Sequence, residues 1–273
     1  MKTSWDILRK ALVCAGVASI VFLWSSMGLS YDVIDVHHGA MIGGTVEFHG
    51  TPPSPLVFEV NKEPDVCGEI RSLTKVDVHQ GRLRGAVIIL EGVEQGKAFE
   101  SQTLTAMAPG EGEFRYASGT RLDLNVRLKN CNFGPFTGVV MADQVVQFSN
   151  HDPIKHTLHT YVLKGKKANI LRTLNTQNLA PQSDLEQTFT PKKLKHGRVV
   201  ALTCDRHDFM ENWMYVVESP YFAISDEAGN FSIDQVPQGQ YDLVAWHPVL
   251  GSQRQIVNVD ENGTLRVNFE FKK

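Results

Sequence analysis

The stretch Cys204-Asp205-Arg206-His207-Asp208-Phe209-Met210 lies between two segments rich in apolar and β-branched residues, Arg198–Cys204 and Trp213–Val217. It places a thiol, an imidazole and a thioether in one short loop at the end of a predicted strand. A further imidazole, that of His156, follows another predicted strand well upstream. One thiolate, two imidazoles and a weak thioether are the ligands of copper sites that transfer electrons. We therefore predict one copper ion held by His156, Cys204, His207 and Met210.

The donor types agree with a redox role for this ion. Thiolate suits Cu(I), imidazole serves both oxidation states, and a weakly bound thioether perturbs neither. A structural zinc site would normally bring paired Cys or His ligands rather than Met. No open metal position beside a general base is visible, so we predict that the protein is not an enzyme. Two other functions stay open: non-redox copper storage or delivery, and a metal-free scaffold or adhesion module of the cell envelope.

The rest of the chain predicts an all-β fold. Strict alternation of apolar and polar residues over Leu122–Leu128 and Leu265–Phe271 indicates half-buried strands. Further runs rich in Val, Ile, Phe and Tyr are separated by turn sequences with Gly, Pro, Asp and Asn. Short strands at such intervals favour sandwiches or barrels. The polar stretch Lys164–Ser183 lacks clear periodicity and is predicted to be a long loop.

The ligand loop resembles the loop of a known family. Its Cys-x-x-His-x-x-Met spacing is similar to that of the cupredoxins, most closely the amicyanin and plastocyanin group, and Lys155–His159 resembles their first-histidine region. On this resemblance His156 is the ligand and His159 is not. The resemblance covers about Leu122–Ser219 and implies a Greek-key barrel or sandwich with a type 1 copper centre. It also implies that electrons leave through the imidazole edge of His207.

The flanks of this region carry a second resemblance. Ala223–Ile233 and Val236–Leu243 are similar to the D-x-x-G-x-F-x-I and P-x-G-x-Y-x-L patterns of the carboxypeptidase regulatory-like, or prealbumin-like, β-sandwich. Related signals occur early, at Gly44–Val46 and Gly85–Gly92. The expected organisation is an N-terminal β region at 40–110, a cupredoxin-like domain at 111–219 and a prealbumin-like part at 220–273. Either the copper domain is inserted into one sandwich, or three β modules follow one another.

The N-terminus predicts export. Lys2, Arg9 and Lys10 precede the apolar run Ala11–Trp24, so residues 1–30 are expected to be a signal peptide or a membrane anchor helix. Both readings place the remaining chain in the periplasm or outside the cell, and the anchor reading attaches it to the membrane through residues 11–30. Expected partners are redox proteins such as a cytochrome or a dehydrogenase.

Composition excludes two classes of protein, and the remaining cysteines suggest a disulfide. The chain has 273 residues, 42% of them hydrophobic, which excludes a disordered protein. The net charge is −3, whereas nucleic-acid-binding proteins are usually basic, so nucleic acid is not an expected partner. In an oxidising compartment Cys67 and Cys131 are candidates for a disulfide, which would contribute roughly 4–5 kcal/mol of stability. The alternative is two separate buried thiols.

Overall fold

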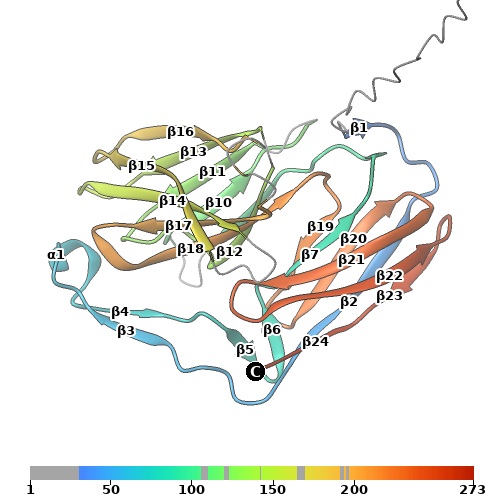
Figure 1. The fold of residues 1–273 in the computed structure, drawn as a ribbon, viewed down its shortest axis with the longest axis horizontal. Coiled ribbons are helices and arrows are strands. Elements are labelled where there is room, and N and C mark those ends of the chain that lie inside the picture. The colour runs from blue at the N-terminus through green and yellow to red at the C-terminus, as the bar shows by residue number, and fades with distance from the viewer. Residues whose placement is uncertain are drawn as a thin grey trace, which may run out of the picture. The chain divides into compact units, whose positions relative to one another are not determined.

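The computed structural model describes residues 31–105, 110–119, 123–141, 143–164, 170–190, 194 and 197–273. These residues form β-strands joined by turns, together with one short helix, α1 (Pro64–Cys67) (Figure 1). The predicted all-β fold class is therefore confirmed. The segment expected to be a signal or an anchor, residues 1–30, lies outside the described residues. In the described part of the chain no helix combines the length and the hydropathy needed to span a bilayer.

The central part of the chain forms two five-stranded sheets with one core. The first sheet has the order β16 (Asp184–Thr188), β13 (Val145–Asn150), β11 (Leu124–Leu128), β10 (Glu113–Tyr116) and β9 (Gln102–Thr105). The second has the order β12 (Thr137–Met141), β18 (His207–Val217), β17 (Val199–Cys204), β14 (His156–Lys164) and β15 (Ile170–Leu179). We call this pair the central sandwich. In the first sheet β11 alternates, with Leu124, Val126 and Leu128 buried. In the second sheet β12 and β17 are buried almost throughout.

Strands from both flanks of the chain form a second pair of sheets around its own core. One sheet has the order β19 (Phe222–Ile224), β7 (Val87–Glu91), β21 (Gly239–His247) and β22 (Gly251–Val259). The other has the order β20 (Asn230–Val236), β2 (Ala40–His49), β6 (Arg82–Arg84) and β5 (Asp77–His79), with β23 (Thr264–Arg266) and β24 (Phe269–Lys272) also paired to β2. A short parallel pair, β1 (Asp32–Val33) and β8 (Gln95–Gly96), completes the N-terminal part. We call the two larger sheets the flanking sandwich.

The two flanks share a core although the central sandwich separates them in sequence. Ile42 and Leu90 from the N-terminal side are buried in one cluster with Leu243 and Phe269 from the C-terminal side. The central sandwich therefore lies between β8 and β19 of the chain, as an insertion would. Strand β9 lies before the boundary expected at residue 110, yet it pairs with β10 of the central sandwich.

A two-stranded ribbon leaves the flanking sandwich after β2. It consists of β3 (Leu56–Glu59), α1 and β4 (Ile70–Leu73), and its strands pair only with each other. Figure 1 shows it in blue and cyan. Cys67 at the end of α1 forms a disulfide with Cys131, in the turn after β11, so the two cysteines singled out from the sequence are bonded. We refer to residues 56–73 as the ribbon.

Two local expectations differ from the structure. The stretch expected to be a loop contains β15, which pairs with β14 along its whole length. It is the edge strand of its sheet, and its sequence mixes apolar and polar residues without strict alternation. Strand β18 begins at His207 rather than near Trp213. The ligand loop is thus a two-residue turn, Asp205-Arg206, between β17 and β18.

The buried histidine at the end of β21 predicts an acid-sensitive fold. His247 is 2% exposed, its Nδ1 accepts a hydrogen bond from the Val249 amide at 3.2 Å, and burial lowers its pKa from 6.5 to about 4. The unfolded chain takes up this proton at the ordinary pKa, so stability is present above pH 6.5 and falls as the pH drops towards 4. We expect this group to account for a loss of up to about 3 kcal/mol.

Urea unfolding of wild type and His247→Asn at pH 7 and pH 4.5 measures this effect. Asparagine retains an acceptor without a titratable ring, so the variant should lose less stability between the two pH values than wild type does. Equal losses would show that His247 does not titrate as described.

Candidate metal centre

Three of the four predicted ligands converge at one end of the central sandwich. His156 begins β14, Cys204 ends β17 and His207 begins β18, and these strands are neighbours in one sheet. The Cys204 Sγ lies 3.8 Å from His156 Nδ1 and 3.7 Å from His207 Nδ1. The three side chains are 0–3% exposed, and their ligand atoms all lie within 4.8 Å of one another. The residues thus present one sulfur and two nitrogens to a common point.

The tight turn between β17 and β18 explains how the thiol and the second imidazole meet. Cys204 and His207 are directly paired across the two strands, and paired residues project to the same face of a sheet. The Asp205 amide donates to the Thr157 carbonyl at 3.0 Å, which ties the turn to the strand that carries His156. Because all three ligands sit at strand ends, backbone pairing fixes their relative positions before any ion binds.

Met210 is placed differently from the other three. It lies inside β18 rather than in a loop, is 2% exposed and belongs to the same core cluster as Cys204. Its burial agrees with a role as a fourth, weak ligand and equally with core packing. The role of Met210 as a weak fourth ligand therefore stays a prediction.

The electrostatics of the centre favour a thiolate. Burial raises the pKa of the Cys204 thiol, but hydrogen bonds from His156 and His207 outweigh burial and lower this pKa to about 6. Burial lowers the pKa of His156, but its hydrogen bonds with Asp152 and Cys204 outweigh burial and raise this pKa to about 9. The deprotonated sulfur is the form that binds metals. The donor set, two imidazole nitrogens and a thiolate, fits copper.

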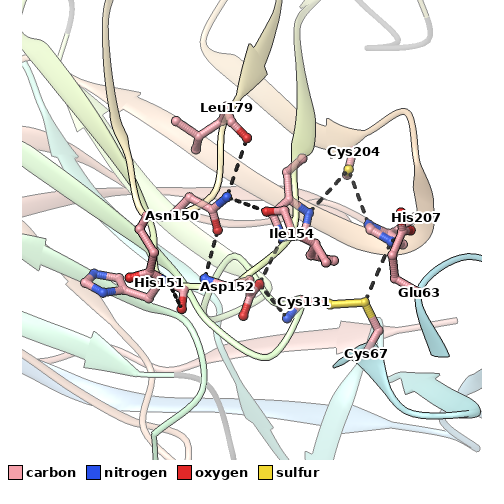
Figure 2. A network of polar contacts seen from close by, with 12 residues as sticks. Glu63, Cys67, Cys131, Asn150, His151, Asp152, Ile154, Leu179, Cys204 and His207 are labelled. Carbon is pink, nitrogen blue, oxygen red and sulfur yellow. Dashed lines mark hydrogen bonds and ion pairs between the residues drawn. A yellow bond between two sulfur atoms is a disulfide. The ribbon is translucent and has the colours of Figure 1, made fainter. Parts of the chain in front are cut away.

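A buried carboxylate holds the first imidazole. Asp152 Oδ2 lies 2.9 Å from His156 Nε2 and also accepts the Cys131 amide hydrogen at 2.9 Å. Asn150 braces the same turn, since its side chain accepts from the Asp152 amide and donates to the Ile154 carbonyl (Figure 2). The sequence interpretation missed Asp152, although an acid four residues before a candidate ligand in a turn was a usable signal.

A second carboxylate reaches the other imidazole from the ribbon. Glu63 Oε2 lies 3.1 Å from His207 Nε2, and the Arg206 guanidinium contacts the same carboxylate. The Cys67 sulfur of the disulfide lies 3.7 Å from that Nε2 (Figure 2). With these neighbours His207 is only 2% exposed. The expectation that electrons leave through the imidazole edge of His207 stays a prediction, and in the structure the ribbon covers this edge.

His159, expected not to be a ligand, lies outside the centre. Its Nδ1 is 3.0 Å from Asp205 Oδ1, and its ring stacks on Tyr161 with ring centroids 4.0 Å apart. These contacts involve the His159 imidazole in interactions other than those of the three converging donor atoms, Cys204 Sγ and the Nδ1 atoms of His156 and His207. The assignment of His156 as a ligand and His159 as a non-ligand stays a prediction.

Comparisons with known proteins give partial likenesses in structure only. No family model matches the chain, and no curated protein matches its sequence. A reduced tryptophan-to-tyrosine variant of amicyanin aligns at 15% identity with a TM-score of 0.27, covering 42% of this chain and 92% of that one. A purple cupredoxin from Nitrosopumilus maritimus aligns at 15% identity with a TM-score of 0.24, covering 30% and 79%. Because these likenesses are low, the candidate copper site is assigned from its own residues alone.

Proposed function

We propose that the protein is an exported type 1 copper protein of cupredoxin type that passes single electrons between redox proteins. The observation that carries this proposal is the buried convergence of Cys204 Sγ with the Nδ1 atoms of His156 and His207. A bound copper ion would supply one-electron chemistry, and Met210 is its proposed fourth ligand. The chain's own contribution is to hold the donors in a geometry that changes little between the two oxidation states of copper.

The burial of the donors favours electron transfer over copper delivery. A delivery protein passes its ion to another set of ligands, which need access to the ion. Here the three donors are 0–3% exposed, and carboxylates hold both imidazoles from behind. Outer-sphere electron transfer needs no such access. We further propose a location in the periplasm or outside the cell, which agrees with the disulfide, and a cytochrome or dehydrogenase as partner.

Titration of the copper-free protein with Cu(II), followed by visible absorption, tests the function. Wild type should bind one equivalent, show an intense thiolate-to-copper band and cycle reversibly under a mild reductant. Cys204→Ser should lose the band. Asp208→Asn, at an exposed position near the start of β18, is the control and should keep the band. Tight binding without the band would instead support storage or delivery, and no binding by the folded protein would support a scaffold.

The proposed fourth ligand gives a separate prediction. Met210→Leu keeps the apolar volume and removes the sulfur, so the free energy of unfolding should change by less than about 1.5 kcal/mol. Copper should still bind through the other three ligands. The reduction potential should change measurably, because the fourth ligand tunes the potential of a copper site of this kind. Cyclic voltammetry measures the potential, and an unchanged value would assign Met210 to the core rather than to the copper.

A further inference from the structure

Glu63 meets the metal centre although it belongs to a different part of the fold. It precedes α1 in the ribbon, with its backbone in the left-handed region at φ 51° and ψ 47°. A non-glycine residue seldom adopts this conformation, which here turns the chain into the helix beside the turn of β17 and β18. From this position its carboxylate reaches two residues of that turn, Arg206 and His207. The copper centre therefore has a neighbour that its own sandwich does not supply.

The contact has a defined chemical consequence for His207. A carboxylate accepts hydrogen bonds, so at 3.1 Å from Glu63 the Nε2 atom of this ring is the donor. With the hydrogen held on Nε2 and the ring fixed in orientation, Nδ1 is the nitrogen left for a metal. That Nδ1 lies 3.7 Å from Cys204 Sγ, on the side where the donors converge. Ligand histidines commonly donate their second nitrogen to a carboxylate in this way.

We propose that Glu63 is a positioning residue of the copper centre, which orients the His207 imidazole and stabilises Cu(II) with its negative charge. The proposal rests on the proposed function and deepens it. On this proposal the ribbon contributes to the properties of the redox site and does not only shield it from solvent. Asp152 holds His156 in the corresponding way, so both imidazoles are fixed from behind by a carboxylate.

The disulfide keeps Glu63 in place. An isolated two-stranded ribbon is marginally stable in water, so this one depends on its attachments. Cys67 donates its amide hydrogen to the Glu63 carbonyl at 2.9 Å, and its sulfur is bonded to Cys131 of the central sandwich. Phe58 packs on Phe209 with ring centroids 6.2 Å apart. The covalent link therefore fixes the start of α1, and with it the carboxylate, relative to His207.

Three variants of the full chain separate orientation from charge. Glu63→Gln keeps an acceptor oxygen and removes the charge, while Glu63→Ala removes both. Glu59→Gln is the matched control, because this exposed glutamate of the same ribbon loses the same charge outside the centre. We expect Cu(II) affinity to fall about 10- to 100-fold in Glu63→Ala, less than tenfold in Glu63→Gln and less than twofold in Glu59→Gln.

The reduction potential reports the charge directly. Because a carboxylate favours the more highly charged ion, both Glu63 variants should have a higher potential than wild type. Each tenfold loss of affinity confined to Cu(II) raises the potential by about 59 mV. Equal shifts in Glu63→Gln and Glu59→Gln would overturn the proposal, since they would show a general charge effect rather than a contact with His207.

A readout without copper keeps this inference separate from the proposed function. In copper-free wild type, ¹⁵N-edited NMR should show a hydrogen on His207 Nε2 that exchanges slowly with water. Glu63→Gln should retain this signal and Glu63→Ala should lose it, while circular dichroism checks that each variant is folded. A wild-type ring without a hydrogen on Nε2 overturns the inference. Failure of wild type to bind copper overturns the proposed function and leaves the NMR result standing.

Discussion

Replacing both Cys67 and Cys131 with alanine is expected to lower the free energy of unfolding by about 4 kcal/mol. The bond joins residues separated by 64 positions, and in the chain-entropy model its main effect is to restrict the unfolded chain. Both cysteines are also 1–2% exposed within the core of the central sandwich. Stability should fall because the unfolded chain gains freedom and the ribbon loses its covalent attachment.

Urea denaturation of the copper-free protein measures this loss. The single variants serve as controls, because either one already breaks the bond. In a double-mutant cycle the double variant should be little less stable than the worse single variant, since the second substitution removes no further bond. A loss below about 1 kcal/mol in the double variant would show that packing alone holds the ribbon.

Three of the predicted ligands could be grouped from the sequence because their arrangement is local. Cys204, His207 and Met210 fall within one strand end, one turn and the start of the next strand, so their spacing in sequence reflects their spacing in the fold. Glu63 could not be found in this way. It lies 144 residues before His207 and arrives through the ribbon and a disulfide. No pattern in the sequence around Glu63 indicates that contact.

The strands show the same division between local and distant information. Alternation predicted strands at Leu122–Leu128 and Leu265–Phe271, and the structure has β11 in the first range and two strands, β23 and β24, in the second. Alternation missed β15, because the apolar residues of that strand do not alternate strictly with the polar ones. It also placed the start of β18 too late, because Asp205-Arg206 lacks the Gly and Asn residues by which tight turns are recognised. Strands on either side of the central sandwich pair with each other, and this pairing depends on contacts between segments that are distant in the sequence. Local patterns do not indicate it.

Asp152→Ala is expected to destabilise the copper-free protein by about 3–5 kcal/mol, the cost of removing one partner from a buried ion pair. In wild type Asp152 is 2% exposed, and its Oδ2 serves both the His156 ring and the Cys131 amide. Alanine leaves both donors buried without a partner. Asp152→Asn keeps an oxygen at this place and should lose less, so the difference between the two variants isolates the acceptor from the charge.

The effect has a pH window set by both partners of the pair. Burial alone would raise the pKa of Asp152, but hydrogen bonds from His156 and Cys131 outweigh it and hold this pKa below 3.8, so its contribution is lost as the pH falls below that value. His156, with its pKa raised from 6.5 to about 9, contributes fully below pH 6.5, and its contribution is lost as the pH rises through 9. The gap in stability between wild type and Asp152→Ala should therefore be widest between about pH 4 and 6.5.

Urea unfolding at pH 5, 7 and 9.5 tests this window in the copper-free protein. Asp143→Asn makes the same chemical change as Asp152→Asn, but at an exposed aspartate just before β13. Its free energy of unfolding should stay within about 0.5 kcal/mol of the wild-type value. A gap between wild type and Asp152→Ala that does not narrow by pH 9.5 would contradict a charged pair. It would show that Asp152 acts only as an acceptor for the Cys131 amide, and that His156 stands at the centre without an ionic partner.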